Sequence, residues 1–75
     1  QHVDHIIRVT MEGNSDVQDA VEAVIGERLG CELAEIERSE EGVQVAYRVS
    51  GRAKHWKELP ERLLDVDGVE RVVRG

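Results

Sequence analysis

The sequence predicts an α+β domain in which two helices cover one face of a four-stranded antiparallel sheet. Four extended segments with alternating apolar residues and two segments with helical periodicity follow one another in the order strand, helix, strand, strand, helix, strand. A short polar turn joins the two central strands, which we therefore expect to form a hairpin. The six segments fill nearly all of the 75 residues, so we expect residues 1–75 to form a single domain.

The first strand and the first helix meet at a polar turn. Apolar and polar residues alternate from His2 to Met11, which predicts a strand with one inward face. Asn14 or Ser15 then supplies a helix cap. Apolar residues recur at helical spacing up to Leu29, and Gly30 is placed to end a helix from Ser15 to Leu29. The predicted inward residues of the strand are Val3, His5, Ile7, Val9 and Met11.

The central hairpin joins an irregular strand to a regular one. From Cys31 to Glu40 the inward phase changes between Leu33 and Ile36, which predicts a bulge or a late strand start. After a short polar turn, Val or Tyr occupies every second position from Val43 to Val49, which predicts a regular strand with one inward face.

The last third of the chain predicts a helix and a strand. Apolar residues recur at helical spacing from Trp56 to Leu64, and Asp67-Gly68 ends the pattern before a strand from Val69 to Arg74. Proline is tolerated in the first turn of a helix and is costly further in. Pro60 therefore predicts either a regular helix that starts near Trp56 to Leu59 or a kink. We expect Trp56 to be packed under this helix rather than to be an exposed anchor for a partner.

The sheet face away from the helices is expected to carry both apolar and polar residues. In a monomer no helix covers this face, so it is either a contact surface for a partner or second copy, or a simply solvated surface. The apolar residues predicted there are Ile6, Ala34, Ile36, Ala46 and Val72, and the polar ones are Arg8, Thr10, Arg38 and Arg48.

The composition excludes several classes of function. The 10 basic and 16 acidic residues give a net charge of −6, an acidic surface that repels nucleic acid. No apolar run approaches the roughly 18 residues needed to cross a bilayer. A lone Cys31 cannot form an internal disulfide, which indicates a reducing, cytoplasmic setting. Because Gln1 is not an initiator methionine, we expect a fragment of a larger protein, either soluble or membrane-bound.

Charge is unevenly distributed along the chain. Opposed acidic and basic surfaces suit association between copies, whereas cross-strand pairs such as Glu37 with Arg48 would neutralise them within one molecule. The acidic residues Glu32, Glu35, Glu37, Glu40 and Glu41 lie in and after the second strand, and the basic residues Arg48, Arg52, Lys54, His55 and Lys57 follow the middle of the third.

The layout and the end of the chain resemble a known family. The segment Leu63 to Val72 is similar to the helix, acidic turn and Gly-Val-x-x-Val strand that end ACT-like domains, which are ferredoxin-like βαββαβ sandwiches. The resemblance runs from about His5 to Arg74. In length and layout the chain is most similar to the C-terminal cytoplasmic domain of MgtC/SapB-type membrane proteins. This resemblance implies a regulatory domain of a transport-related, membrane-bound protein, and the open sheet face and the opposed charges favour self-association.

The ACT resemblance also implies a small ligand, typically an amino acid, at the loop after the first strand. A helix N-terminus preceded by Gly13 offers backbone N–H groups to an anion. The family usually has Pro-Gly and an apolar residue in this loop, which are missing here, and Glu12 and Asp16 would repel an anion. An ordinary turn and helix cap is therefore the alternative. The candidate ligand-binding residues are Met11, Glu12, Gly13, Asn14, Ser15 and Asp16.

No residue cluster in the sequence forms a complete catalytic or metal site. The loop after the first strand lacks the paired thiolates that soft metals need. Cys31 has no nearby His in sequence and is interpreted as a small buried hydrophobic residue. His2, Asp4 and His5 are interpreted as surface residues rather than metal ligands. We predict no enzyme activity and no cofactor, and a regulatory or self-association domain, with amino-acid or divalent-metal sensing at the loop as the alternative.

Overall fold

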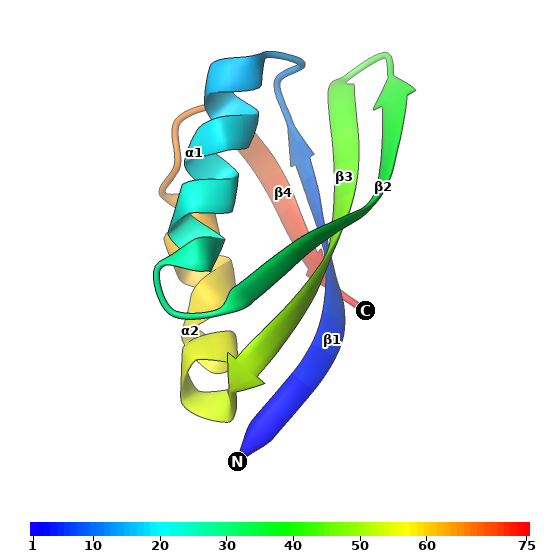
Figure 1. Ribbon diagram of the computed structural model, residues 1–75. Coiled ribbons are helices and arrows are strands. Elements are labelled where there is room, and N and C mark those ends of the chain that lie inside the picture. The colour runs from blue at the N-terminus through cyan, green and yellow to red at the C-terminus, as the bar shows by residue number, and fades with distance from the viewer.

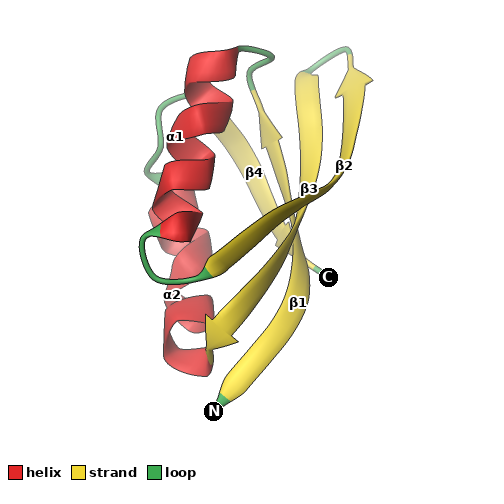
Figure 2. Ribbon diagram, viewed as in Figure 1, coloured by secondary structure: helices red, strands yellow, loops and turns green.

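The computed structural model describes residues 1–75 and has the predicted ferredoxin-like architecture (Figure 1). The strands form one antiparallel sheet in the order β2-β3-β1-β4. Both helices lie on the same side of this sheet (Figure 2). Neither helix has the length and hydropathy that crossing a bilayer requires. The elements are β1 (His2–Met11), α1 (Ser15–Gly26), β2 (Gly30–Ser39), β3 (Gly42–Arg52), α2 (Ala53–Leu64) and β4 (Val69–Arg74).

A mainly aliphatic core fills the space between the sheet and the helices. Both aromatic residues, Tyr47 and Trp56, are buried in it, so Trp56 is a core residue rather than an exposed anchor. His5 is exposed, but its ring lies with its centroid 5.1 Å from that of Trp56. The core residues are Ile7, Val9, Met11, Val17, Val21, Ile25, Leu29, Val43, Val45, Tyr47, Val49, Trp56, Leu59 and Leu63.

Two helix boundaries differ from the prediction. The first helix ends at Gly26 rather than at Leu29. The backbone N–H of Leu29 still donates to the Ile25 carbonyl (3.1 Å), and Leu29 is buried, so the apolar periodicity continues past the regular helix. The second helix begins at Ala53, which places Pro60 in its interior. The alternative of a helix starting near Trp56 to Leu59 is therefore wrong.

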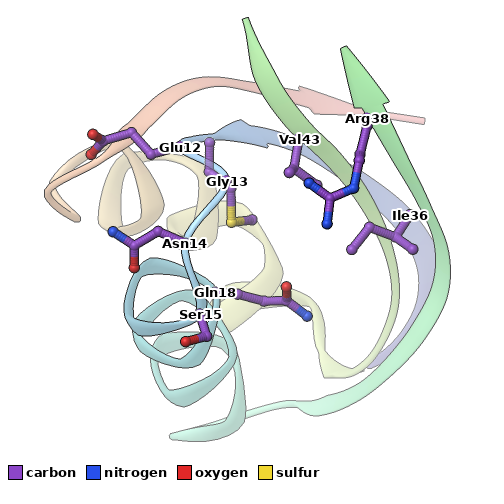
Figure 3. A pocket seen from close by; sticks show the side chains of 9 residues that line it. Glu12, Gly13, Asn14, Ser15, Gln18, Ile36, Arg38 and Val43 are labelled. Atoms are coloured by element: carbon purple, nitrogen blue, oxygen red, sulfur yellow. The ribbon is translucent and has the colours of Figure 1, made fainter. Parts of the chain in front are cut away.

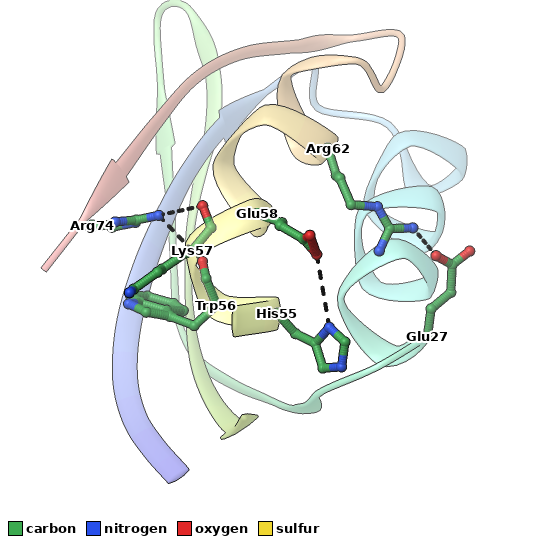
Figure 4. A network of polar contacts seen from close by, with 7 residues as sticks. All are labelled: Glu27, His55, Trp56, Lys57, Glu58, Arg62 and Arg74. Carbon is green, nitrogen blue, oxygen red and sulfur yellow. Dashed lines mark hydrogen bonds and ion pairs between the residues drawn. The ribbon is translucent and has the colours of Figure 1, made fainter. Parts of the chain in front are cut away.

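Pro60 leaves a backbone carbonyl of α2 without its usual helical donor. Proline has no N–H, so the Trp56 carbonyl, four residues earlier, loses its partner. Arg74 of β4 takes this place: its Nη2 donates to the carbonyls of Trp56 (3.3 Å) and Lys57 (2.8 Å), as Figure 4 shows. The Arg74 guanidinium carbon also lies 5.3 Å from the centroid of the Trp56 ring. The last strand thereby stabilises the interrupted helix.

The cost of removing Arg74 is expected to depend on Pro60. Arg74→Ala should lower the free energy of unfolding by about 1–3 kcal/mol, because it leaves the partly buried Trp56 carbonyl unpaired. In a Pro60→Ala background the cost should shrink, since the alanine N–H donates to the Trp56 carbonyl. Urea unfolding of the four proteins in a double-mutant cycle measures this coupling. Arg71→Ala on the same strand is the control, and equal costs of Arg74→Ala in both backgrounds would contradict the role.

Three residues predicted for the open face of the sheet lie on the other face. Ile36, Arg38 and Val72 face the helices, because each lies opposite a residue of the core between the sheet and the helices. The predicted bulge in β2 is confirmed as a register shift between Leu33 and Glu35, and it reverses the phase of the strand. A second register shift lies between Thr10 and Met11 in the pairing of β1 with β4, and it places Val72 on the helix side of the sheet. The predicted residues that do lie on the open face are Ile6, Arg8, Thr10, Ala46 and Arg48.

Ion pairs on the open face link neighbouring strands. Arg48 of β3 forms two hydrogen bonds of 2.9 Å with the Asp4 carboxylate of β1, and chiefly this contact lowers the pKa of Asp4. Arg8 of β1 forms an ion pair with Glu35 of β2, with 3.3 Å between Nη1 and Oε1. The pair spans Ala46 of β3, which lies between the two residues in the sheet. The predicted pairing of Glu37 with Arg48 is wrong, since the register places Glu37 opposite a glutamine.

Candidate functional site

A cavity of ≈ 380 Å³ lies between the β1–α1 loop and the β2–β3 hairpin (Figure 3). This volume falls within the range of small-molecule sites. The cavity is lined by five of the six loop residues singled out from the sequence, and Asp16 is the one that does not line it. The hairpin and α1 contribute the rest. The lining residues are Met11, Glu12, Gly13, Asn14, Ser15, Gln18, Ile36, Arg38 and Val43.

The loop beside the cavity is held by backbone hydrogen bonds. The N–H of Glu12 donates to the Gly68 carbonyl (2.9 Å), and the N–H of Asn14 donates to the Glu12 carbonyl (2.8 Å). The Asn14 side chain caps α1, because its Oδ1 accepts from the N–H groups of Asp16 (2.8 Å) and Val17 (3.2 Å). Two of the backbone donors expected to be available to an anion are therefore already used by the cap.

The hairpin side of the cavity depends on Gly42. This residue has φ of +133°, a conformation that only glycine adopts without strain. A Cβ atom there would lie 2.4 Å from the Met11 carbonyl oxygen. The close approach brings the tip of the hairpin against the end of β1, where the cavity begins.

Arg38 gives the cavity its charge. Its side chain points from β2 toward the cavity, whereas the Glu12 carboxylate points away from it (Figure 3). A Cβ on Gly68 would lie 2.6 Å from Glu12 Oε2, so the carboxylate is packed against that glycine. Arg38 forms no ion pair. The Glu12 carboxylate is thus turned away from the cavity, Asp16 does not line it, and the Arg38 guanidinium faces it.

Gln18 is oriented by a polar network at the other side of the cavity. Its Nε2 donates to Glu22 Oε2 (3.0 Å), and the Tyr47 hydroxyl donates to the same oxygen (2.9 Å). Burial, and then the contact with Glu22, raise the pKa of Tyr47 far above its ordinary value. The phenol therefore stays a donor, and the Gln18 side-chain carbonyl is left as an acceptor.

The other residues singled out from the sequence do not assemble into a site. Cys31 is exposed on the edge strand β2, so its interpretation as a buried residue is wrong. Partial burial of the thiol, and then the Glu22 carboxylate, raise its pKa, which disfavours the nucleophilic thiolate. At the chain start, Asp4 binds Arg48 and His5 lies against Trp56. The structure contains no group of three His, Cys, Asp or Glu side chains that could hold a metal ion.

The architecture is that of a ferredoxin-like sandwich with a cavity beside the first loop. The structure is similar to the crystal structure of the ACT domain from GTP pyrophosphokinase of Chlorobium tepidum, with a TM-score of 0.69, 18% sequence identity and full coverage of both chains. This likeness shows that the chain has the fold of an ACT domain. No family model and no curated protein matches the sequence significantly.

Proposed function

We propose that this chain is a non-enzymatic, ACT-like regulatory domain that binds an amino acid or a related small carboxylate in the cavity beside the β1–α1 loop. The observation that carries the proposal is the Arg38 side chain, which points toward the cavity and forms no ion pair. A guanidinium in this setting suits a carboxylate, which it binds through two parallel hydrogen bonds.

The remaining lining residues suit the other parts of an amino acid. The Gln18 carbonyl, held in place through Glu22, is an acceptor for an ammonium group. Met11, Ile36 and Val43 supply an apolar surface for an aliphatic side chain. Gly13 keeps the loop side open, since a Cβ there would lie 3.2 Å from Val43 Cγ2.

Amide-shift NMR titration with a panel of amino acids, nucleotides, Mg²⁺ and Zn²⁺ tests this function. We expect saturable shifts at the lining residues with amino acids or similar carboxylates. Arg38→Gln should weaken binding about 10- to 100-fold, because a charged hydrogen bond contributes roughly 1.5–3 kcal/mol. Arg28→Gln, in the turn between α1 and β2 and outside the cavity lining, is the matched control. A panel that produces no shifts would remove the ligand proposal, and a response to Mg²⁺ or Zn²⁺ alone would replace it with divalent-metal sensing.

A second function, self-association within a larger protein, is supported by exposed apolar side chains on both outer strands. Leu33 and Ile36 of β2 are 50% and 51% exposed, and Val73 of β4 is 47% exposed. The layout resembles the cytoplasmic domain of MgtC/SapB-type proteins, so the proposed parent is a membrane-bound, transport-related protein with this domain in the cytoplasm. The parent is tested by the full-length gene, which should encode membrane-spanning segments. Self-association is tested by sedimentation of this chain over a wide concentration range.

A further inference from the structure

We propose that the domain self-associates head to tail, with the free edge of β2 paired to the free edge of β4 from a second copy. This inference rests on the proposed self-association and specifies its surface. β2 and β4 are the two ends of the sheet, and each is hydrogen-bonded to a strand on one side only. Every residue of β2 is exposed. Both edges therefore present unpaired backbone N–H and C=O groups to solvent.

The directions of the strands permit this pairing without reorienting either copy. Neighbours in the order β2-β3-β1-β4 are all antiparallel, so β2 and β4 of one molecule run in opposite directions. A second copy in the same orientation places its β4 antiparallel to β2 of the first. The open faces then lie on the same side, and the antiparallel sheet continues from one molecule to the next.

One register of this pairing sets one pair of apolar residues and two pairs of opposite charges against each other. When Ile36 lies opposite Val72 of the second copy, the two apolar residues meet on the helix side. The same register sets Glu37 opposite Arg71 on the open side, and Arg38 opposite Glu70. None of these four charged residues forms an ion pair within the molecule, whereas Asp4, Arg8, Glu35 and Arg48 on the open face all do.

Two-fold pairing of like edges fits less well. If β2 pairs with β2 around Ile36, Glu35 of each copy lies opposite Glu37 of the other, and like charges directly opposite are destabilising. If β4 pairs with β4 around Val72, Arg74 would have to pair with Glu70, but its guanidinium is bound to the carbonyls of α2. That arrangement would also leave the apolar side chains of β2 uncovered. Charge and apolar complementarity therefore favour the head-to-tail arrangement.

Charge reversal at Glu37 and Arg71 tests the pairing. In a sedimentation series, the wild-type chain should form species beyond the dimer as concentration rises, because each added copy leaves a free β2 and a free β4. Glu37→Lys and Arg71→Glu should each weaken association roughly fivefold or more. An equimolar mixture of the two variants should associate again, since acidic and basic side chains then face each other at every interface.

The controls are Glu61→Lys and Arg28→Glu, which make the same charge changes away from both edges, alone and mixed. Amide spectra confirm that each variant is folded. Stronger association of Glu37→Lys would overturn the inference in favour of β2 pairing with β2. No effect of either reversal would overturn it in favour of another surface. A wild-type chain that stays monomeric would remove self-association altogether, and the ligand titration would stand independently of all three results.

Discussion

Replacing Leu63 with alanine is expected to lower the free energy of unfolding by about 2–5 kcal/mol. Leu63 is a residue of α2 whose side chain is 0% exposed in the core, so truncation removes buried apolar surface and leaves a cavity. A domain of this size has a total stability of roughly 4–11 kcal/mol, so the variant should be close to unfolding at room temperature. Urea or thermal unfolding followed by circular dichroism measures the loss.

The adjacent residue supplies the matched control. Leu64 is 52% exposed, so Leu64→Ala should change stability by under about 0.5 kcal/mol. The two substitutions remove the same atoms from neighbouring positions of one helix, and only burial distinguishes them. Equal losses of stability would mean that α2 does not pack on the sheet through the face that carries Trp56, Leu59 and Leu63.

The second large effect is expected at high pH and comes from Tyr47. Its phenol is buried and donates to Glu22, and its pKa is raised well above the ordinary value of about 10. A group whose pKa is higher in the folded than in the unfolded state stabilises the fold. This stabilisation is complete at pH values below the pKa of the group in the unfolded chain. That stability is lost as the pH rises further. Above about pH 10, stability should therefore fall by up to roughly 1.4 kcal/mol per pH unit from this residue alone.

Ultraviolet absorbance of the phenolate provides a direct measurement, since the chain has one tyrosine. The phenolate should appear together with unfolding and not before it. Tyr47→Phe should remove this part of the alkaline pH dependence while other groups still titrate. Reversible ionisation of Tyr47 near pH 10 in the folded protein would contradict the buried hydrogen bond to Glu22. It would also contradict the anchoring of Gln18 beside the cavity.

The ligand and association proposals share residues, but the association can be tested with substitutions that lie outside the cavity. Ile36 and Arg38 line the cavity, and the same two residues lie on the β2 edge that we propose to pair with β4. Substituting Arg38 therefore acts on both the cavity and the proposed pairing, whereas Glu37 and Arg71 lie outside the cavity lining and test association alone. Ligand binding that changes the concentration dependence of association would couple the two.

Much of the candidate site was predictable from the sequence, and the remainder was not. The loop from Met11 to Ser15 was found because a polar turn between a strand and a helix is a local pattern. Gln18 and Arg38 were missed as lining residues because no local signal indicates which distant elements meet. Arg38 had been predicted on the opposite face, since its phase depends on how the chain resumes pairing after the β2 bulge.

The sequence by itself determined the order of elements, the sheet and the apolar core, because alternation in strands and helical spacing are periodicities of the local backbone. Only the tertiary structure decided the features that depend on residues distant in the chain. Pro60 lies within α2, and the Trp56 carbonyl that it leaves free accepts a hydrogen bond from Arg74 of β4. Cys31 is exposed because β2 is at the edge of the sheet. The charge of the cavity likewise depends on Gly68, which has no side chain and so leaves room for the Glu12 carboxylate on the side away from Arg38.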